Sequence, residues 1–415
     1  MSDGVDHAAA DARDSGSGSA AGDVTALHQP SLVAHVTQLD HDAGLAAAVE
    51  RAVAPFGGWA ALVKPGERIA VKINLLRAAP PESAVCTHPE TLRCVLRALK
   101  AAGAQPFVGD SPGGPGTRGF VMRAYKVSGI AAVCAEEQVE VVWVDEHVDT
   151  LAAPAARLYR SFPVGRPWIE ADGIIQVGIL KTHGLMRLTG GTKLTFGCVS
   201  GLSKPQLHVR SQRRDEFADM LIDLHLALAP RFTIFDGIVA MEGKGPGSGK
   251  PRKLGSLFAA RDAIALDVAL ADRTAHRRHE IYVLTAAQRR GLVDLERPYE
   301  LTGDDIVAEH DFVPAKWDAD VLGVGPLTWF NTPRLNRMVR SLITARPRLV
   351  DEPACTRCGN CAEICGADAI TLAPTPLFDE SRCVRCFCCT EVCPTAAIVE
   401  VSPSLAKVVG KISRR

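Results

Sequence analysis

The sequence predicts an α/β fold, with a large domain built on a mostly parallel sheet with flanking helices and a small α+β domain after it. Over residues 30–320, short apolar segments alternate with Ala- and Leu-rich segments of helical spacing. Closely spaced cysteines are concentrated between residues 355 and 393. The 415 residues, 47% of them hydrophobic, leave room for a core of about 300 residues ahead of the cysteines.

The expected strands are apolar segments bounded by Gly or Pro, at residues 32–36, 69–73, 106–108, 139–144, 174–177 and 232–235. The expected helices span residues 89–102, 217–228 and 263–271. Ligands of parallel sheets bind beyond the carboxyl ends of the strands. Polar residues that follow these strands are therefore candidates for a binding site.

The first two such loops follow the strands at residues 69–73 and 106–108. Lys72 and Asn74 lie at the end of the first strand, and Thr87-His88-Pro89 opens the next helix. Asp110 lies in a glycine-rich turn after the second strand. A simpler interpretation stays open for two of them, because His88 can cap its helix and Asp110 can form a turn or cap.

Two further loops combine lysine, histidine and glycine. Lys181-Thr182-His183 is expected just after the strand at residues 174–177, and Lys193 follows two glycines. Residues 241–249 are too rich in glycine for a helix or an ordinary strand. Lysines and the backbone amides of glycine turns suit an anion, and His or Asp can move protons. The candidate catalytic residues are Lys181, His183 and Asp110, and the candidate substrate-binding residues are Lys72, Asn74, His88, Thr182, Lys193, Gly243 and Gly245.

One cysteine pattern occurs twice, 28 positions apart, as Cys355-x2-Cys358-x2-Cys361-x3-Cys365 and Cys383-x2-Cys386-x2-Cys389-x3-Cys393. In this pattern three cysteines bind one iron-sulfur cluster while the fourth reaches a second cluster. The spacing predicts two [4Fe-4S] clusters, one bound by Cys355, Cys358, Cys361 and Cys393 and one by Cys383, Cys386, Cys389 and Cys365. Zinc sites usually show two separated pairs instead, and a disulfide framework belongs to secreted proteins.

The repeat continues beyond the cysteines, so that Ala369 matches Ala397 and Ile370 matches Ile398. Residues 350–403 thus resemble a bacterial two-cluster ferredoxin. The resemblance implies a small α+β fold and one-electron transfer between partners. Gly366 stands where that family usually has proline, and Cys388 is an additional cysteine that we expect not to be a ligand.

The large domain resembles an uncharacterised family, domain-of-unknown-function family 362, often fused to such a ferredoxin. The motifs that carry the resemblance are Lys72-x-Asn74, Thr87-His88-Pro89, Gly109-Asp110-Ser111, Lys181-Thr182-His183, Lys193 and Glu242-Gly243-x-Gly245-Pro246. Ile73 stands where proline is common, and Leu194 where asparagine is expected. The resemblance implies iron-sulfur chemistry but no settled reaction.

The remaining expectations concern organisation and location. Residues 1–29 are expected to be disordered, 321–349 to form a linker helix and 404–415 a basic tail. The N-terminus is no secretory signal and no segment has the roughly 18 apolar residues of a membrane span, which predicts a cytoplasmic protein without a membrane partner. With 47 basic and 47 acidic residues, no overall charge favours nucleic acid.

These features together predict an iron-sulfur redox protein. The favoured function is a ferredoxin-fused oxidoreductase whose clusters pass electrons to an anionic small molecule or cofactor in the large domain. The alternative is a non-enzymatic electron carrier or maturation factor that acts on a protein client. The expected partner is accordingly an anionic substrate or a redox protein, and the sequence by itself leaves the substrate, the direction of electron flow and the oligomeric state open.

Overall fold

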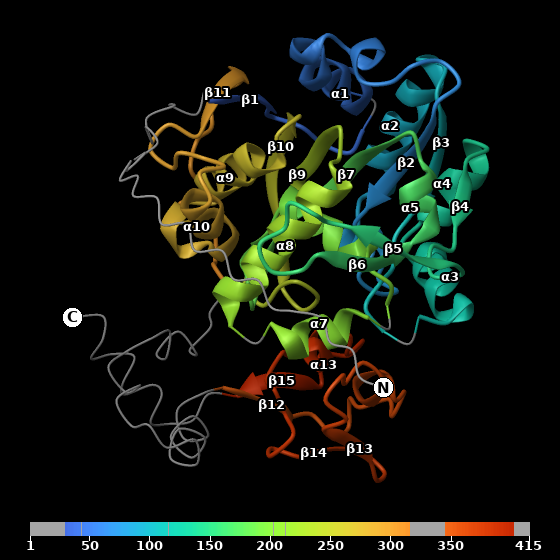
Figure 1. Ribbon diagram of the computed structural model, residues 1–415, viewed down its shortest axis with the longest axis vertical. Coiled ribbons are helices and arrows are strands. Elements are labelled where there is room, and N and C mark those ends of the chain that lie inside the picture. The colour runs from blue at the N-terminus through green and yellow to red at the C-terminus, as the bar shows by residue number, and fades with distance from the viewer. Residues whose placement is uncertain are drawn as a thin grey trace, which may run out of the picture.

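A mixed nine-stranded sheet forms the centre of the protein, in the order β11-β1-β10-β9-β7-β2-β3-β4 with β8 paired to β7 (Figure 1). The computed structural model describes residues 30–42, 44–114, 116–201, 203–211, 213–315 and 345–401. Strands β9, β7, β2, β3 and β4 run parallel to one another, while β10 is antiparallel to both of its neighbours. The predicted α/β class with a mostly parallel sheet is confirmed.

The strands of this sheet are β1 Ser31–Val36, β2 Arg68–Ile73, β3 Gln105–Gly109, β4 Glu140–Val142, β7 Gly173–His183, β8 Arg187–Thr189, β9 Phe232–Glu242, β10 Lys250–Ala260 and β11 Tyr299–Gly303. A separate hairpin consists of β5 Val148–Ala152 and β6 Ser161–Gly165. Strand β7 is longer than the segment expected at residues 174–177, because Gly178 and Ile179 continue to pair with β9 and the last residues pair with β8. Lys181, Thr182 and His183 therefore lie in a strand, and their prediction as a loop was wrong.

Helices cover both faces of the sheet. Helices α1 Leu45–Val53, α2 Pro89–Ala101, α3 Arg118–Val127 and α4 Ile130–Glu136 pack on one face, and α8 Arg214–Leu228, α9 Ala263–Arg273 and α10 Tyr282–Arg289 pack on the other. The shorter helices are α5 Arg166–Glu170, α6 Gly191–Leu194 and α7 Lys204–Arg210. Turns of 3₁₀ helix lie at Ala54–Phe56, Trp59–Ala61, Pro81–Ser83, Thr195–Cys198 and Arg278–Glu280. Each face has its own apolar core, so the sheet is buried on both sides, as parallel sheets are.

The cysteine-rich C-terminal part is built from two antiparallel pairs of short strands and two short helices. Strand β12 Arg346–Leu349 pairs with β15 Ile398–Val401, and β13 Ile370–Leu372 pairs with β14 Pro376–Phe378. Helices α12 Asn360–Glu363 and α13 Cys388–Glu391 lie 28 positions apart, in the register of the cysteine repeat. Residues 1–29, 404–415 and most of the predicted linker helix lie outside the described residues, and the last four residues assigned to that helix form β12.

This C-terminal part lies against helix α7, which separates it from the large sheet in Figure 1. Gly366 approaches the helix so closely that a Cβ there would come within 2.7 Å of the Pro205 Cβ. On the same side, a Cβ on Gly113 would lie 3.5 Å from the Val392 Cγ1. The glycine that replaces the usual proline thus stands where any side chain would push the two parts of the chain apart.

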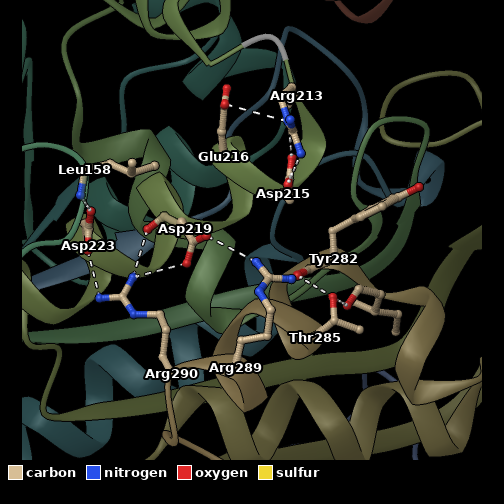
Figure 2. A network of polar contacts seen from close by, with 11 residues as sticks. Leu158, Arg213, Asp215, Glu216, Asp219, Asp223, Tyr282, Thr285, Arg289 and Arg290 are labelled. Carbon is tan, nitrogen blue, oxygen red and sulfur yellow. Dashed lines mark hydrogen bonds and ion pairs between the residues drawn. The ribbon is translucent and has the colours of Figure 1, made fainter. Parts of the chain in front are cut away.

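A network of charged residues joins α8 to α10 (Figure 2). The Asp223 carboxylate is fully buried and accepts a hydrogen bond of 2.8 Å from the Arg290 guanidinium. It also accepts from the backbone N–H groups of Arg157 and Leu158, at 3.0 and 2.8 Å, in the turn between β5 and β6. One carboxylate therefore holds two helices and a hairpin together. Among the described residues, no helix is long and apolar enough to cross a membrane.

Replacement of Asp223 by alanine should destabilise the protein by about 3 kcal/mol, because the buried Arg290 guanidinium loses its closer carboxylate and keeps only Asp219, at 3.7 Å. The urea unfolding midpoint, followed by circular dichroism, measures the loss. Asp215→Ala is the matched control, since Asp215 pairs with Arg213 at the exposed end of the same network (Figure 2) and should matter little. Equal shifts for the two variants would contradict the role of Asp223.

Candidate functional site

A cavity opens at the carboxyl ends of β2, β3 and β7, between the large sheet and the C-terminal part. It encloses about 740 Å³, including the part open to solvent. Lysines on three different segments line it, namely Lys72, Lys193 and Lys204. We call it the lysine cavity. Its position is the one where parallel sheets bind ligands.

Five of the candidate residues from the sequence line this cavity: Lys72, Asn74, Asp110, His183 and Lys193. They come from β2 and the segment after it, the end of β3, the end of β7 and helix α6. The other five candidates, Lys181, Thr182, His88, Gly243 and Gly245, are not part of its lining. The fold thus brings together half of the predicted set.

Lys72 and Asp110 form a buried ion pair on the floor of the lysine cavity. The Lys72 Nζ lies 3.1 Å from the Asp110 Oδ2, and the side chains are 1% and 4% exposed. The same Oδ2 accepts a hydrogen bond of 2.6 Å from the backbone N–H of Leu75. Burial raises the pKa of Asp110, while the Lys72 and Lys204 charges oppose that rise. The pair contributes little net charge to the cavity.

Lys193 and Lys204 supply positive charge without a carboxylate as close as that of Lys72. The Lys204 ammonium donates a hydrogen bond to the backbone carbonyl of Ser111. Burial lowers the pKa of Lys204 to about 8 and also lowers the pKa of Lys193. Both lysines are more readily deprotonated than an exposed lysine, and both gain from a bound anion.

The hydrogen bonds of His183 define its tautomer. Its Nδ1 accepts from the backbone N–H groups of Leu185 and Met186, at 3.1 and 3.3 Å. In the neutral ring the proton therefore lies on Nε2, which is 3.4 Å from the Glu391 Oε1 of helix α13. Burial lowers the pKa of His183 well below its usual value. His183 is thus a hydrogen-bond donor toward the lysine cavity.

Lys181 and Thr182 serve the structure around the cavity. The Lys181 Nζ donates to the backbone carbonyl of Val85 at 2.6 Å, and burial lowers its pKa to about 7. The Thr182 Oγ1 donates to the Gly243 carbonyl at 3.1 Å and accepts from the Gly245 N–H at 3.2 Å. Thr182 thereby fastens the glycine-rich loop to β7, and Gly243 and Gly245 line a second cavity beside β15.

His88 lies in a different place. Its ring accepts a hydrogen bond from the Glu90 N–H, so it caps helix α2. It also stacks on His41, with ring centroids 3.5 Å apart, and the His41 Nε2 lies 2.8 Å from the Asp236 Oδ2. The capping interpretation that the sequence left open therefore holds for His88.

Two buried polar atoms in the lining have no hydrogen-bond partner among the described residues. They are the side-chain oxygens Asn74 Oδ1 and Thr189 Oγ1. Thr189 is only 2% exposed. Buried polar groups are almost always paired, so orphan atoms on a cavity wall point to a ligand or ordered water that would pair them. The side-chain amide of Asn74 can be turned over, so it can offer the cavity either a donor or an acceptor.

The C-terminal cysteines line two smaller cavities of equal size, about 350 Å³ each. The first is lined by Cys355, Cys358, Cys361 and Cys393, and the second by Cys365, Cys383, Cys386, Cys388 and Cys389. All thirteen cysteines of the chain are free thiols. The described residues hold no group of three or more His, Cys, Asp or Glu side chains placed to bind a single metal ion. Ile364 and Cys388 line both the second cysteine cavity and the lysine cavity.

Comparison with known proteins places the large domain in a family. Residues 69–272 match the model described as domain of unknown function DUF362. The chain is also 32% identical over 275 residues to the thylakoid-associated protein sll1697 of Synechocystis sp., a match that covers 64% of this chain and 84% of that protein. The protein belongs to the DUF362 family. All the candidate residues of the large domain lie within the matched range.

A solved structure, the lactate racemase apoprotein from Thermoanaerobacterium thermosaccharolyticum, is a more distant match. Its TM-score is 0.36 and its sequence identity 15%, over 56% of this chain and 54% of that one. The match thus spans about half the length of the solved protein. Similarity at this level bears on neither substrate nor mechanism.

The site of this DUF362 protein includes residues that the sequence did not single out as binding or catalytic. Lys204 was only one polar residue among several after β7, and Thr189 has no motif of its own. Glu391 comes from the cysteine repeat, where nothing in the sequence distinguishes it from a solvated surface residue. Glu391 joins the other two only because the C-terminal part lies against the large domain at this cavity.

Asp267 is a further residue that sequence reasoning missed. It lies on the apolar helix α9 and accepts hydrogen bonds from the backbone N–H groups of Gly191 and Thr192, at 2.5 and 3.1 Å. These bonds hold the start of helix α6, which carries Lys193. Burial raises the pKa of Asp267 to about 7. An acidic residue in the middle of an apolar helix is the one sequence feature that could have indicated it.

Replacement of Gly197 by alanine should destabilise this DUF362 protein by about 1–3 kcal/mol, because overpacking at this point separates a buried pair. A Cβ at Gly197 would come within 2.3 Å of the Asp110 Oδ1 and 2.5 Å of the Lys72 Nζ. Gly119→Ala is the control, since a Cβ at that helical position meets nothing within 4 Å. The urea unfolding midpoint measures both variants. A Gly197 variant as stable as the Gly119 variant would contradict the packing described here.

Proposed function

We propose that the protein is an iron-sulfur reductase, in which two [4Fe-4S] clusters pass electrons to an anionic small molecule bound in the lysine cavity. The observation that carries this proposal is the wall that two cavities share. Ile364 and Cys388 face the cysteine cavity on one side and the lysine cavity on the other. An electron leaving the cysteine cavity would therefore reach the anion across a single layer of side chains.

The cysteines fit two clusters because four of them surround each cavity in the grouping that the spacing predicts. Cys393 completes the first group, and Cys365 completes the second. Bound clusters of this type accept and donate single electrons. Cys388 is the surplus thiol of the second cavity, and we assign it as a non-ligand because Cys389 keeps the register of the repeat.

The lysine cavity suits an anion because its positive charges outnumber those that its carboxylates neutralise. Asp110 neutralises Lys72 at 3.1 Å, which leaves Lys193 and Lys204 with one further carboxylate in the lining, that of Glu391. The unpaired Thr189 hydroxyl and Asn74 amide add hydrogen bonds for the ligand. Charge-assisted hydrogen bonds of this kind are about twice as strong as neutral ones, which favours an anion over an uncharged molecule.

Reduction of most small molecules also requires a proton. We assign this role to Lys204, because its side chain lines the cavity and burial lowers its pKa to about 8, close to neutral pH. His183 is less suited than the sequence suggests, since protonation of its Nδ1 would break two hydrogen bonds from the backbone. Asp110 is tied to Lys72 and the Leu75 N–H and serves to position Lys72.

The proposed location is cytoplasmic, where reducing conditions keep the cysteines available to bind clusters. The name of the Synechocystis relative associates that protein with thylakoids. The competing function, a non-enzymatic electron carrier or maturation factor, would use the clusters without any small anion. The second experiment below distinguishes the two.

Cys389→Ser should remove one cluster, whereas the adjacent substitution Cys388→Ser should leave both in place. Anaerobically purified wild type is expected to hold about eight iron and eight sulfide per chain, and Cys389→Ser about half of that. Iron and sulfide analysis with electron spin resonance measures the content. Because Cys388 lines the same cavity, Cys388→Ser is a matched control. Loss of iron from Cys388→Ser alone would reverse the ligand assignment.

Lys193→Ala should weaken the response of the reduced protein to small anions while both clusters remain. We expect that carboxylates or phosphates shift the spin-resonance spectrum of the reduced wild type, and that the variant binds them about tenfold more weakly or worse. Lys253→Ala is the control, because Lys253 lies exposed on β10 and pairs with Asp40. If no anion affects the wild type and both variants transfer electrons to other proteins normally, the carrier function is correct instead.

A further inference from the structure

Glu391 and Glu363 occupy the same place in the cysteine repeat, yet their surroundings differ completely. Glu391 ends helix α13 and Glu363 ends helix α12, and the two positions are 28 residues apart. Each lies two residues after one cysteine of its motif and two before the next. Glu363 is exposed to solvent, whereas Glu391 lines the lysine cavity. Of the two equivalent carboxylates, only that of Glu391 faces the lysine cavity, because the C-terminal part lies against α7 on that side.

The contacts of Glu391 are those expected of a bound carboxylate. Its Oε1 lies 3.4 Å from the His183 Nε2, the ring atom that carries the proton. Lys193 lines the same cavity as Glu391. Its side chain is 20% exposed, so it reaches into the cavity from the open side and is not part of the close-packed wall. The Glu391 carboxylate thus lies near one ring nitrogen that carries a proton and shares its cavity with a lysine.

We propose that the ligand of the lysine cavity is a small carboxylate, and that Glu391 occupies the place of the ligand carboxylate beside the His183 Nε2 until the ligand displaces it. The inference rests on the proposed function, because it concerns the same cavity. A planar carboxylate is favoured over a phosphate because the group now seated there has two oxygens and one donor ring facing it.

Occupation by Glu391 has two consequences. It keeps a negative charge in the same cavity as Lys193 in the absence of ligand. It also lowers the apparent affinity for the ligand, since only molecules with the side chain displaced can bind. Removal of the Glu391 charge should therefore tighten carboxylate binding, the opposite of what is expected from a residue that holds the substrate.

The experiment measures binding of trifluoroacetate to the anaerobically purified, cluster-loaded protein by ¹⁹F resonance broadening, with succinate as competitor. Glu391→Gln keeps the shape of the side chain and Glu391→Ala empties the space, and Glu363→Gln is the matched control at the equivalent exposed position. Iron content and thermal unfolding of each variant establish that clusters and fold are retained. Inorganic phosphate is titrated in parallel.

We expect both Glu391 variants to bind trifluoroacetate about tenfold more tightly than wild type, and Glu363→Gln to bind it as wild type does. A tenfold gain is the result for a site that the Glu391 side chain fills about nine-tenths of the time. Unchanged or weaker binding in Glu391→Gln, with binding lost in Lys193→Ala, would overturn this inference and leave the proposed anion site standing. Tighter binding of phosphate than of trifluoroacetate in the Glu391 variants would overturn the carboxylate class. If no variant binds either anion, the proposed function fails together with the inference.

Discussion

Burial of several lysines at one end of a sheet is the constraint on which the rest of this structure depends. A buried ammonium group is costly unless it is paired or hydrogen-bonded. The lysines here meet that demand in different ways. Lys72 pairs with Asp110, Lys181 and Lys204 donate to the backbone carbonyls of Val85 and Ser111, and Lys193 lines the same cavity as Glu391. The partners of the first three come from the large domain, while the cavity around Lys193 is completed by the C-terminal part.

This dependence links the cysteine cavities to the lysine cavity. The C-terminal part closes one side of the lysine cavity, and it can approach because Gly366 has no side chain where it meets Pro205. Inside the large domain, Gly197 lies against the Lys72–Asp110 pair and Gly190 against the Asp267 carboxylate. In each case the absence of a Cβ lets charged groups and backbone come together in a space that a larger residue would fill. The glycines that looked like turn residues in the sequence are close-contact positions.

Several parts of the fold and site could be predicted because they depend on local spacing. Lys72 and Asp110 were found because polar residues that end buried strands are unusual, and they lie together in the cavity. Strand β7 shows where this reasoning stopped. Its end is apolar until Leu180, and only its pairing with β8 and β9 extends it through His183. Because side chains alternate along a strand, Lys181 and His183 share one face while Thr182 points to the glycine-rich loop on the other. Of the three, only His183 lines the lysine cavity, while Lys181 and Thr182 bind backbone groups around it.

The sequence by itself determined which residues are able to bind metal clusters, since cysteines two or three residues apart can converge through the geometry of a short loop alone. It also determined the α/β class, because strand and helix periodicity is a property of neighbouring residues. Only the tertiary structure decided which cavity the cysteine-rich part lies against. Glu363 and Glu391 are the same residue in the same repeat, and a local pattern cannot tell them apart. One lies in solvent and the other among buried lysines, because the docking of two distant parts of the chain is a matter of shape and charge across a surface.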